Sequence, residues 1–244
     1  MKLSKLSSTK FYSNKILAIQ FKYLGDAVIL TPALKAMATQ IPHVELHVLV
    51  ATEVAPLLEN IPWIKKVWAM PRHRSKLKLS LTLPFVQVLR REKFDRSIDF
   101  GGNDRGALMS YLSGANIRLG STNSRDPKWM QRICYTEIVR QNDPSAPYFD
   151  LHFELLSAWQ IKRPHQLKIE IFSKVCDPDA ILKICPSNSI ICHISTSQPK
   201  KDWPLIHWQA LYHLARQGGL KVFFSAGPSS RERRLLAELK LLVP

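Results

Sequence analysis

The chain has 244 residues, of which 45% are hydrophobic and 22% are charged. These proportions are those of ordinary globular proteins, so a disordered or fibrous chain is excluded. Lys and Arg number 35 against 19 Asp and Glu, a net charge of +16, which predicts an anionic partner: a nucleic acid, an acidic membrane surface or a phosphorylated substrate.

Hydropathy gives no sign of a membrane anchor. No apolar run approaches the roughly 18 to 20 residues that cross a bilayer. The first fifteen residues carry four lysines and lack the apolar core of a secretory signal. We therefore expect a cytoplasmic protein without a cleaved leader.

Strands alternate with helices along the first half of the chain. Short apolar runs predict the strands, and helical spacing of apolar residues predicts the helices between them. The expected strands are residues 16–21, 44–50, a short one within 63–70, 94–100 and 117–119, and the expected helices are 26–41, 83–93 and 105–113. This repeated order predicts a parallel sheet with right-handed crossovers.

A second block of the same kind begins near residue 187. Between the blocks, residues 122–147 predict a long loop and 149–161 a helix. The second block has a strand at 190–194, a helix at 205–217, a strand at 220–225 and a helix from 231 toward 242. Two strands make only a partial sheet, and we expect its bare edge at 220–225 to be available for dimer formation.

This organisation divides the chain into three parts. We expect a basic tail over residues 1–14, a first domain with its connecting segment over 15–170, and a partial second domain over 187–244. The four cysteines are few and irregularly spaced, so neither a disulfide framework nor a metal site is expected. They are Cys134, Cys176, Cys185 and Cys192.

The loop after the first strand is the first candidate site. Ligands of open α/β sheets bind at the carboxyl ends of strands, where residues 21–28 lie. Gly25 allows a tight turn, and Asp26 opens the following helix. Position alone favours a helix-capping role for Asp26, with a catalytic carboxylate as the alternative.

Residues 100–107 also join a strand to a helix. Gly101 and Gly102 permit close approach of a ligand, and polar side chains that could contact hydroxyls or anions follow them. These are Asn103, Asp104 and Arg105. The segment matches neither a Walker A motif nor G-x-G-x-x-G, so kinase and dinucleotide functions lose their best support.

Residues 195–204 follow the first strand of the second block. Hydroxyl groups and two lysines precede a helix there, which favours a phosphate site as much as a solvated loop with Trp203 as a packing anchor. The residues that would bind phosphate are Ser195, Thr196, Ser197, Lys200 and Lys201.

Half of the net charge lies in one stretch, residues 63–96. This stretch contains ten basic residues and only two acidic ones, Glu92 and Asp95. Trp63 and Trp68 lie in the same stretch. This composition suits an anionic membrane surface. Nucleic acid would fit on charge alone, because no helix-turn-helix, RNP or zinc-finger pattern is present, and it is not expected.

Together these segments resemble glycosyltransferase family 9, the ADP-heptose:lipopolysaccharide heptosyltransferases. The resemblance runs from about residue 15 to about residue 239 and is carried by three stretches in the family's order: ILAIQFKYLGDAVILTPAL, DFGGNDRGALMSYLSGANIRLG and HISTSQPKKDWPLIHWQAL. It implies an α/β fold of GT-B type, with a complete N-terminal Rossmann-like domain for the acceptor and a partial C-terminal one for the nucleotide-sugar.

The resemblance also implies roles for residues. Asp26 would be the general base of an inverting transfer, and Lys201, or Lys200 in its place, would neutralise the departing diphosphate. The hydroxyls of Ser195, Thr196 and Ser197 would donate to that diphosphate. The remaining substrate contacts would come from Gly25, Asn103, Asp104, Arg105 and, at the nucleotide ribose, Glu232.

The partners implied are ADP-heptose, the inner core of lipopolysaccharide and the inner face of the inner membrane, with neither a metal nor a cofactor. The family's usual Asp-[Ser/Thr]-Gly-x-x-His stretch, which binds the donor, is absent from this sequence. We therefore expect a chain truncated at its C-terminus. The alternative to a heptosyltransferase is an inactive remnant that binds anionic glycolipid.

Overall fold

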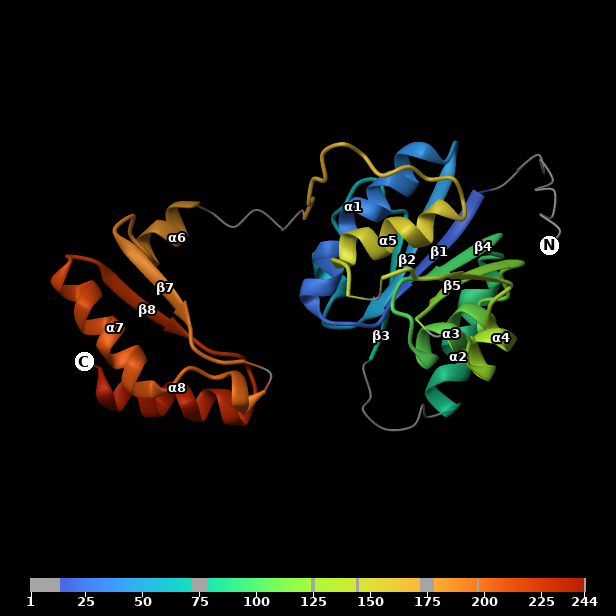
Figure 1. Cartoon of the computed structure of the whole chain (residues 1–244). Coiled ribbons are helices and arrows are strands. Elements are labelled where there is room, and N and C mark those ends of the chain that lie inside the picture. The colour runs from blue at the N-terminus through green and yellow to red at the C-terminus, as the bar shows by residue number, and fades with distance from the viewer. Residues whose placement is uncertain are drawn as a thin grey trace. The chain divides into compact units, whose positions relative to one another are not determined.

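The computed structural model describes residues 14–71, 79–123, 126–143, 145–171, 178–196 and 198–243. The chain forms two compact units, Met1–Lys174 and Val175–Pro244 (Figure 1). In these described ranges, every helix is too short or too polar to cross a bilayer. The predicted tail over residues 1–14 lies, except for Asn14, outside the described residues.

A six-stranded parallel sheet forms the centre of the first unit, in the order β3-β2-β1-β4-β5-β6. Its strands are β1 (Asn14–Gln20), β2 (Val44–Ala51), β3 (Lys66–Met70), β4 (Arg96–Asp99), β5 (Ile117–Thr122) and β6 (Glu137–Arg140). This is the order of a doubly wound fold, and it reverses between β1 and β4. The predicted α/β parallel sheet is confirmed.

Helices cover both faces of this sheet (Figure 1). They are α1 (Leu24–Gln40), α2 (Leu79–Arg91), α3 (Asp104–Leu112), α4 (Trp129–Cys134) and α5 (Tyr148–Ser157), with a 3-10 turn η1 (Ala55–Leu57). In β1, Ile16 and Ala18 pack toward α1 and α5, whereas Leu17 and Ile19 pack toward α2 and α3. The strand is a continuous apolar run because both of its faces are buried.

The prediction of a long loop at residues 122–147 is wrong. That segment holds the short helix α4 and the edge strand β6. Cys134 and Tyr135 pack against Ala107 with Ile138 beside them, which anchors both elements. A six-residue helix and a four-residue strand with charged ends carry too little periodicity to be recognised, and charged ends are typical of edge strands.

The two tryptophans of the basic stretch point to partners within the protein. Trp68 is buried, and its indole N–H donates to Nδ1 of His47 at 3.1 Å. Trp63 is half-buried and donates to Glu170 at 3.1 Å. Both rings are fixed by internal partners, so only the charge of this stretch is available to an anionic surface.

A polar network closes the amino edge of the sheet. Glu45, His47 and Glu92 place ligand atoms within 4.8 Å of one another, as a cation site would require. However, Lys15 already contacts both carboxylates, at 2.9 and 3.1 Å, and Lys66 contacts Glu92 at 3.2 Å. Burial lowers the pKa of His47, and Trp68 and Glu45 engage its two ring nitrogens. The ammonium groups of Lys15 and Lys66 thus supply the positive charge that a metal ion would bring to these carboxylates, and the network has a structural role.

The second unit is smaller. It contains α6 (Pro178–Ile184), β7 (Ser189–His193), a 3-10 turn η2 (Pro199–Lys201), α7 (Leu205–Gln217), β8 (Lys221–Ser225) and α8 (Ser230–Leu242). Strands β7 and β8 pair in parallel as predicted, and a core around Ile194, Leu239 and Val243 joins them to α7 and α8. Ile191 of β7 is 64% exposed, so one face of this sheet is open among the described residues.

Packing around Gly120 gives a test of the first unit. An added Cβ there would lie 2.3 Å from the ring of Tyr135, whereas an added Cβ at Gly25 meets no atom within 4 Å. We expect Gly120→Ala to lower the free energy of unfolding by about 1 to 3 kcal/mol. Gly25→Ala, the matched control, should change it by less than about 1 kcal/mol, toward stabilisation. Native-state hydrogen exchange of the β1 amides measures both, and equal effects would contradict this packing.

Candidate functional site

Asp26 lies in the first turn of α1, just after β1, at the carboxyl edge of the sheet. Its Oδ2 accepts a hydrogen bond from the backbone N–H of Tyr23 at 2.9 Å, which caps the helix. Its other oxygen, Oδ1, has no hydrogen-bond partner in the described part of the chain. The capping role expected from position is therefore present, and one carboxylate oxygen is left for other chemistry. Gly25 is exposed beside it.

The loop between β4 and α3 leaves the same edge, because β1 and β4 are neighbours. Asn103 caps α3, its Oδ1 accepting from the N–H of Gly106 at 2.9 Å. Arg105 donates to the carbonyl of Pro71 at 2.7 Å. Asp104 is exposed in the first turn of α3. Of the three predicted contacts in this loop, Asn103 and Arg105 thus have structural partners, and Asp104 faces solvent.

Asp99, the last residue of β4, is a buried carboxylate that the sequence analysis missed. It is 0% exposed, and it accepts hydrogen bonds from the hydroxyl of Tyr135 at 2.7 Å and from the N–H of Gly101 at 2.8 Å. Burial raises the pKa of Asp99 to about 6, although these hydrogen bonds oppose the rise. Gly106 is required here, because a Cβ would lie 2.3 Å from the carboxylate.

A cavity of about 200 Å³ opens next to this loop. It lies at the carboxyl ends of β4, β5 and β6 and is bordered by α5. Its walls include Gly101 and Gly102, and His152 of α5 also lines it. Neither Asp26 nor any of the predicted contacts at residues 103–105 lines this cavity. No sequence pattern indicated His152, since a lone histidine on an apolar helix face is common.

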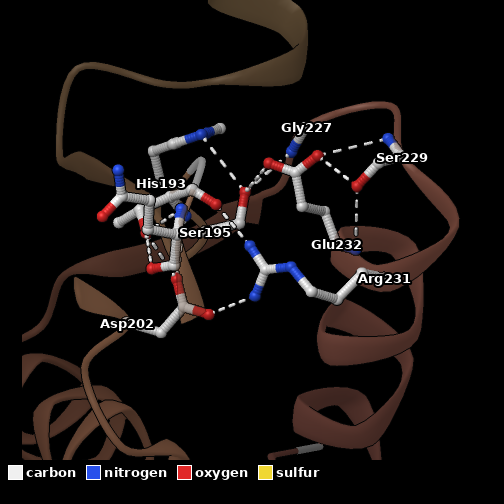
Figure 2. A network of polar contacts seen from close by, with 9 residues as sticks. His193, Ser195, Asp202, Gly227, Ser229, Arg231 and Glu232 are labelled. Atoms are coloured by element: carbon white, nitrogen blue, oxygen red, sulfur yellow. Dashed lines mark hydrogen bonds and ion pairs between the residues drawn. The ribbon is translucent and has the colours of Figure 1, made fainter. Parts of the chain in front are cut away.

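The second unit brings three predicted residues into one polar network at the carboxyl ends of β7 and β8 (Figure 2). Ser195 donates to Glu232 at 3.0 Å and accepts from the N–H of Gly227 at 2.9 Å. A Cβ at Gly227 would lie 2.3 Å from Glu232 Oε1, so a larger residue there would displace this carboxylate. Hydrogen bonds from Ser229, the N-cap of α8, and from Ser195 hold the pKa of Glu232 below its usual value.

Thr196 belongs to the other half of this network. Its N–H donates to Asp202 at 2.9 Å, and its hydroxyl lies 2.8 Å from the same oxygen. Arg231 bonds both Asp202 and the carbonyl of Thr196 (Figure 2). Arg231 and Thr196 lower the pKa of Asp202. The donors expected to receive diphosphate are thus engaged with carboxylates of the same unit.

Lys200 and Lys201 are exposed on η2, and neither forms an ion pair within the described residues. Ser197 lies outside the described residues, so its predicted contact is not placed. The exposed lysines are the positive charges that an incoming anion would meet beside this network.

The family model for glycosyltransferase family 9 (heptosyltransferase) matches residues 82–243, more than half of the chain. The chain belongs to glycosyltransferase family 9. The matched residues include the loops that follow β4 and β7.

Relatives of this family 9 chain are distant. A Haemophilus influenzae protein is 29% identical over 127 residues, which are 52% of this chain and 34% of that protein. The lipopolysaccharide heptosyltransferase 3 of Escherichia coli is 20% identical over 120 residues, 48% of this chain and 35% of that protein. The matches thus span about a third of each relative's length.

Solved structures share the fold. The family 9 glycosyltransferase of Veillonella parvula superposes with a TM-score of 0.74 at 17% identity, covering 94% of this chain and 66% of that one. The E. coli heptosyltransferase WaaC with ADP-2-deoxy-2-fluoro heptose gives 0.71 at 17% identity, covering 92% and 72%. The GT-B type of fold implied by the resemblance is confirmed.

The buried carboxylate makes stability of this family 9 chain depend on pH. The pKa of Asp99 rises from 3.8 to about 6 on folding, so folding takes up a proton between these values. The corresponding stability, about 3 kcal/mol, is present below pH 4 and is lost as pH rises through 6. Asn cannot titrate, so the stability of Asp99→Asn relative to wild type should rise by about 2 kcal/mol from pH 4 to pH 7.

Urea unfolding of both proteins across this pH range measures the difference. Tyr135→Phe serves as a second variant, because loss of a hydrogen bond that lowers the pKa of Asp99 should move the pH window upward. Parallel pH profiles for wild type and Asp99→Asn would show that the carboxylate does not carry this dependence.

Proposed function

We propose that this family 9 chain transfers heptose from ADP-heptose to the inner core of lipopolysaccharide, with Asp26 as general base. The observation that carries the proposal is the Asp26 carboxylate at the carboxyl edge of the sheet, with one oxygen capping α1 and the other without a partner in the described residues. Two similar E. coli proteins support this choice: one is a lipopolysaccharide heptosyltransferase, and the other is a heptosyltransferase solved with ADP-2-deoxy-2-fluoro heptose.

In the proposed step, an acceptor hydroxyl attacks the anomeric carbon of the heptose. Oδ1 of Asp26 takes the hydroxyl proton as the new C–O bond forms, which is general base catalysis. The bond between the anomeric carbon and the phosphate oxygen breaks, and ADP leaves with the electron pair. A single displacement of this kind inverts the anomeric centre.

The second unit would hold the nucleotide-sugar. Lys201, or Lys200 beside it, would neutralise the charge that develops on the leaving diphosphate, and both ammonium groups are exposed for this purpose. Ser195 and Thr196 would have to exchange their hydrogen bonds with Glu232 and Asp202 for bonds to phosphate oxygens. We propose Ser197 as a further donor, and Glu232 as the contact to the ribose.

We propose that the protein acts in the cytoplasm at the inner face of the inner membrane, because the proposed acceptor is linked to lipid. Exposed basic side chains of the first unit support this proposal through charge, since anionic lipid attracts Lys and Arg near the surface. Those described are Lys65, Lys66, Arg90, Arg91 and Lys93.

A second candidate function is binding of anionic glycolipid without transfer. The contrast between the units favours it: the first has a six-stranded sheet and a cavity, whereas the second has a two-stranded sheet with an exposed face. Such a chain would bind the acceptor and have no measurable affinity for ADP-heptose.

ADP release from ADP-heptose in the presence of a lipid A–Kdo or heptosylated acceptor tests the transfer. Asp26→Asn keeps an oxygen that can cap α1, so we expect a folded protein whose turnover falls by about 100- to 10,000-fold. Glu59→Gln neutralises another exposed carboxylate of the first unit and should leave turnover unchanged.

Equal turnover by wild type and Asp26→Asn would reject Asp26 as the base. Absence of turnover in wild type, with acceptor binding retained in both proteins, would favour the glycolipid-binding function instead.

A further inference from the structure

Asp99 is a buried acid of the carboxyl edge that the proposed transfer step does not use. Its Oδ1 accepts a hydrogen bond from the N–H of Gly101 at 2.8 Å, and its Oδ2 accepts from the hydroxyl of Tyr135 at 2.7 Å. The N–H of Gly102 donates to the same carboxylate. All three of these partners are donors. Such a set suits an ionised carboxylate, whereas a protonated acid needs an acceptor for its own proton.

The backbone of the β4–α3 loop is shaped around this carboxylate. A Cβ at Gly106 would lie 2.3 Å from Oδ2 of Asp99, and a Cβ at Gly101 would lie 3.1 Å from Oδ1. At Gly102 the backbone has a φ of 62°, which favours glycine. The loop therefore follows the acid closely on several sides, and a change in the hydrogen bonds of the acid has to move the loop.

Gln20, the last residue of β1, connects this loop to the one before α1. Its side chain is 1% exposed. Oε1 of Gln20 lies 3.2 Å from the place of a Cβ on Gly101, and it accepts a hydrogen bond from the N–H of Lys22 at 3.2 Å. The amide side chain is thus packed against the β4–α3 loop while it holds the backbone of the β1–α1 loop.

Arg105 makes a second connection between the two loops. Its guanidinium lies 4.5 Å from the centre of the Phe21 ring, and it donates to the carbonyl of Pro71 at 2.7 Å. Phe21 leads directly into the segment that carries Asp26. Displacement of the β4–α3 loop is therefore transmitted to the segment with the proposed base.

The groups around this pair of side chains decide which of them titrates. Burial raises the pKa of Asp99 to about 6, although its hydrogen bonds and the charge of Lys22 oppose the rise. Burial and the charge of Asp99, with smaller effects of Cys134 and Asp104, raise the pKa of Tyr135. Tyr135 therefore keeps its proton, and Asp99 is the member of the pair that changes its charge near neutral pH.

We propose that Asp99 is a positioning residue, which in its ionised form holds the β4–α3 loop in place and, through that loop, the segment that carries Asp26. The inference rests on the proposed function only in taking Asp26 as the base. Protonation sets a fourth donor against three, so the hydroxyl of Tyr135 has to turn and accept. The glycine N–H groups then keep a neutral acceptor, and hydrogen bonds to a neutral group are about half as strong as those to a charged one.

Amide chemical shifts of the whole chain test this coupling without any transfer reaction. The measurement is ¹H–¹⁵N NMR between about pH 4.5 and pH 8, read at Gly101, Gly102 and Lys22. We expect the three amides to share one midpoint near pH 6. The glycine amides move because their acceptor loses its charge, and the Lys22 amide moves because Gln20 lies between the loops.

Two variants assign this midpoint to Asp99. Asp99→Asn is a non-titrating analogue of the protonated acid, and it should remove the midpoint from all three amides. Tyr135→Phe keeps the carboxylate and removes a donor that lowers its pKa, so it should move the midpoint to higher pH. The matched control, Glu59→Gln, neutralises an exposed carboxylate of the same unit and should titrate as wild type does.

Turnover distinguishes a positioning role from a merely structural one. With ADP release as the assay, Asp99→Asn should lower kcat at least tenfold at about pH 7.5. The KM for ADP-heptose should stay unchanged, because the nucleotide-sugar is assigned to the second unit. The ratio of wild-type to variant kcat should fall as pH falls through 6, since wild type then carries a neutral acid as well. A merely structural acid would give a ratio that does not depend on pH.

The proposal is overturned if the glycine amides of wild type have no midpoint near pH 6, if that midpoint persists in Asp99→Asn, or if the Lys22 amide does not follow it. Its failure can be told from failure of the proposed function. Coupled titration of the three amides without ADP release keeps the loop positioning and rejects the transfer. ADP release with a ratio of kcat values that is independent of pH keeps the transfer and rejects the positioning role.

Discussion

Burial of β1 on both of its faces is the constraint that determines the architecture of the first unit. Residues Ile16 to Ile19 are all 0% exposed, and β1 pairs in parallel with β2 on one side and β4 on the other. Only a strand at the centre of a parallel sheet, covered by helices on both faces, can meet these conditions. Parallel pairing then forces the loops after β1 and β4 to leave at one edge, which brings Asp26 to the same edge as Gly101 and Gly102.

The two edges of this sheet differ in whether their buried polar side chains have partners. At the amino edge, Lys15 forms ion pairs with both Glu45 and Glu92, and both nitrogens of His47 have hydrogen-bond partners. At the carboxyl edge, the pKa of Asp99 is raised by burial and His152 has no partner among the described residues. Such groups cost stability, and perturbed titratable groups gather at functional sites. Because the polar groups are fully partnered at the amino edge and not at the carboxyl edge, the functional edge of the sheet is indicated to be the carboxyl one.

The sequence was sufficient for the parts of the fold that have a strong period. The apolar run of β1 and the helical spacing of α7 and α8 predicted their elements within a few residues. It was insufficient for α4 and β6, which are short and are held in place by tertiary contacts of Cys134, Tyr135 and Ile138 in the cluster around Ala107. Asp26 and Ser195 follow strands and were found on that ground. Asp99 lies within a strand and His152 within a helix, and their burial depends on the sheet order, which local patterns do not encode.

We propose that the first unit receives the acceptor and the second unit the nucleotide, each at the carboxyl ends of its strands. Hydrogen exchange of the whole chain with and without ADP tests this division most directly. We expect slower exchange around Thr196 and around Glu232 when ADP is bound, with no change in the loops at residues 21–26 and 100–106. Protection of those first-unit loops by ADP, or no protection in the second unit, would contradict it.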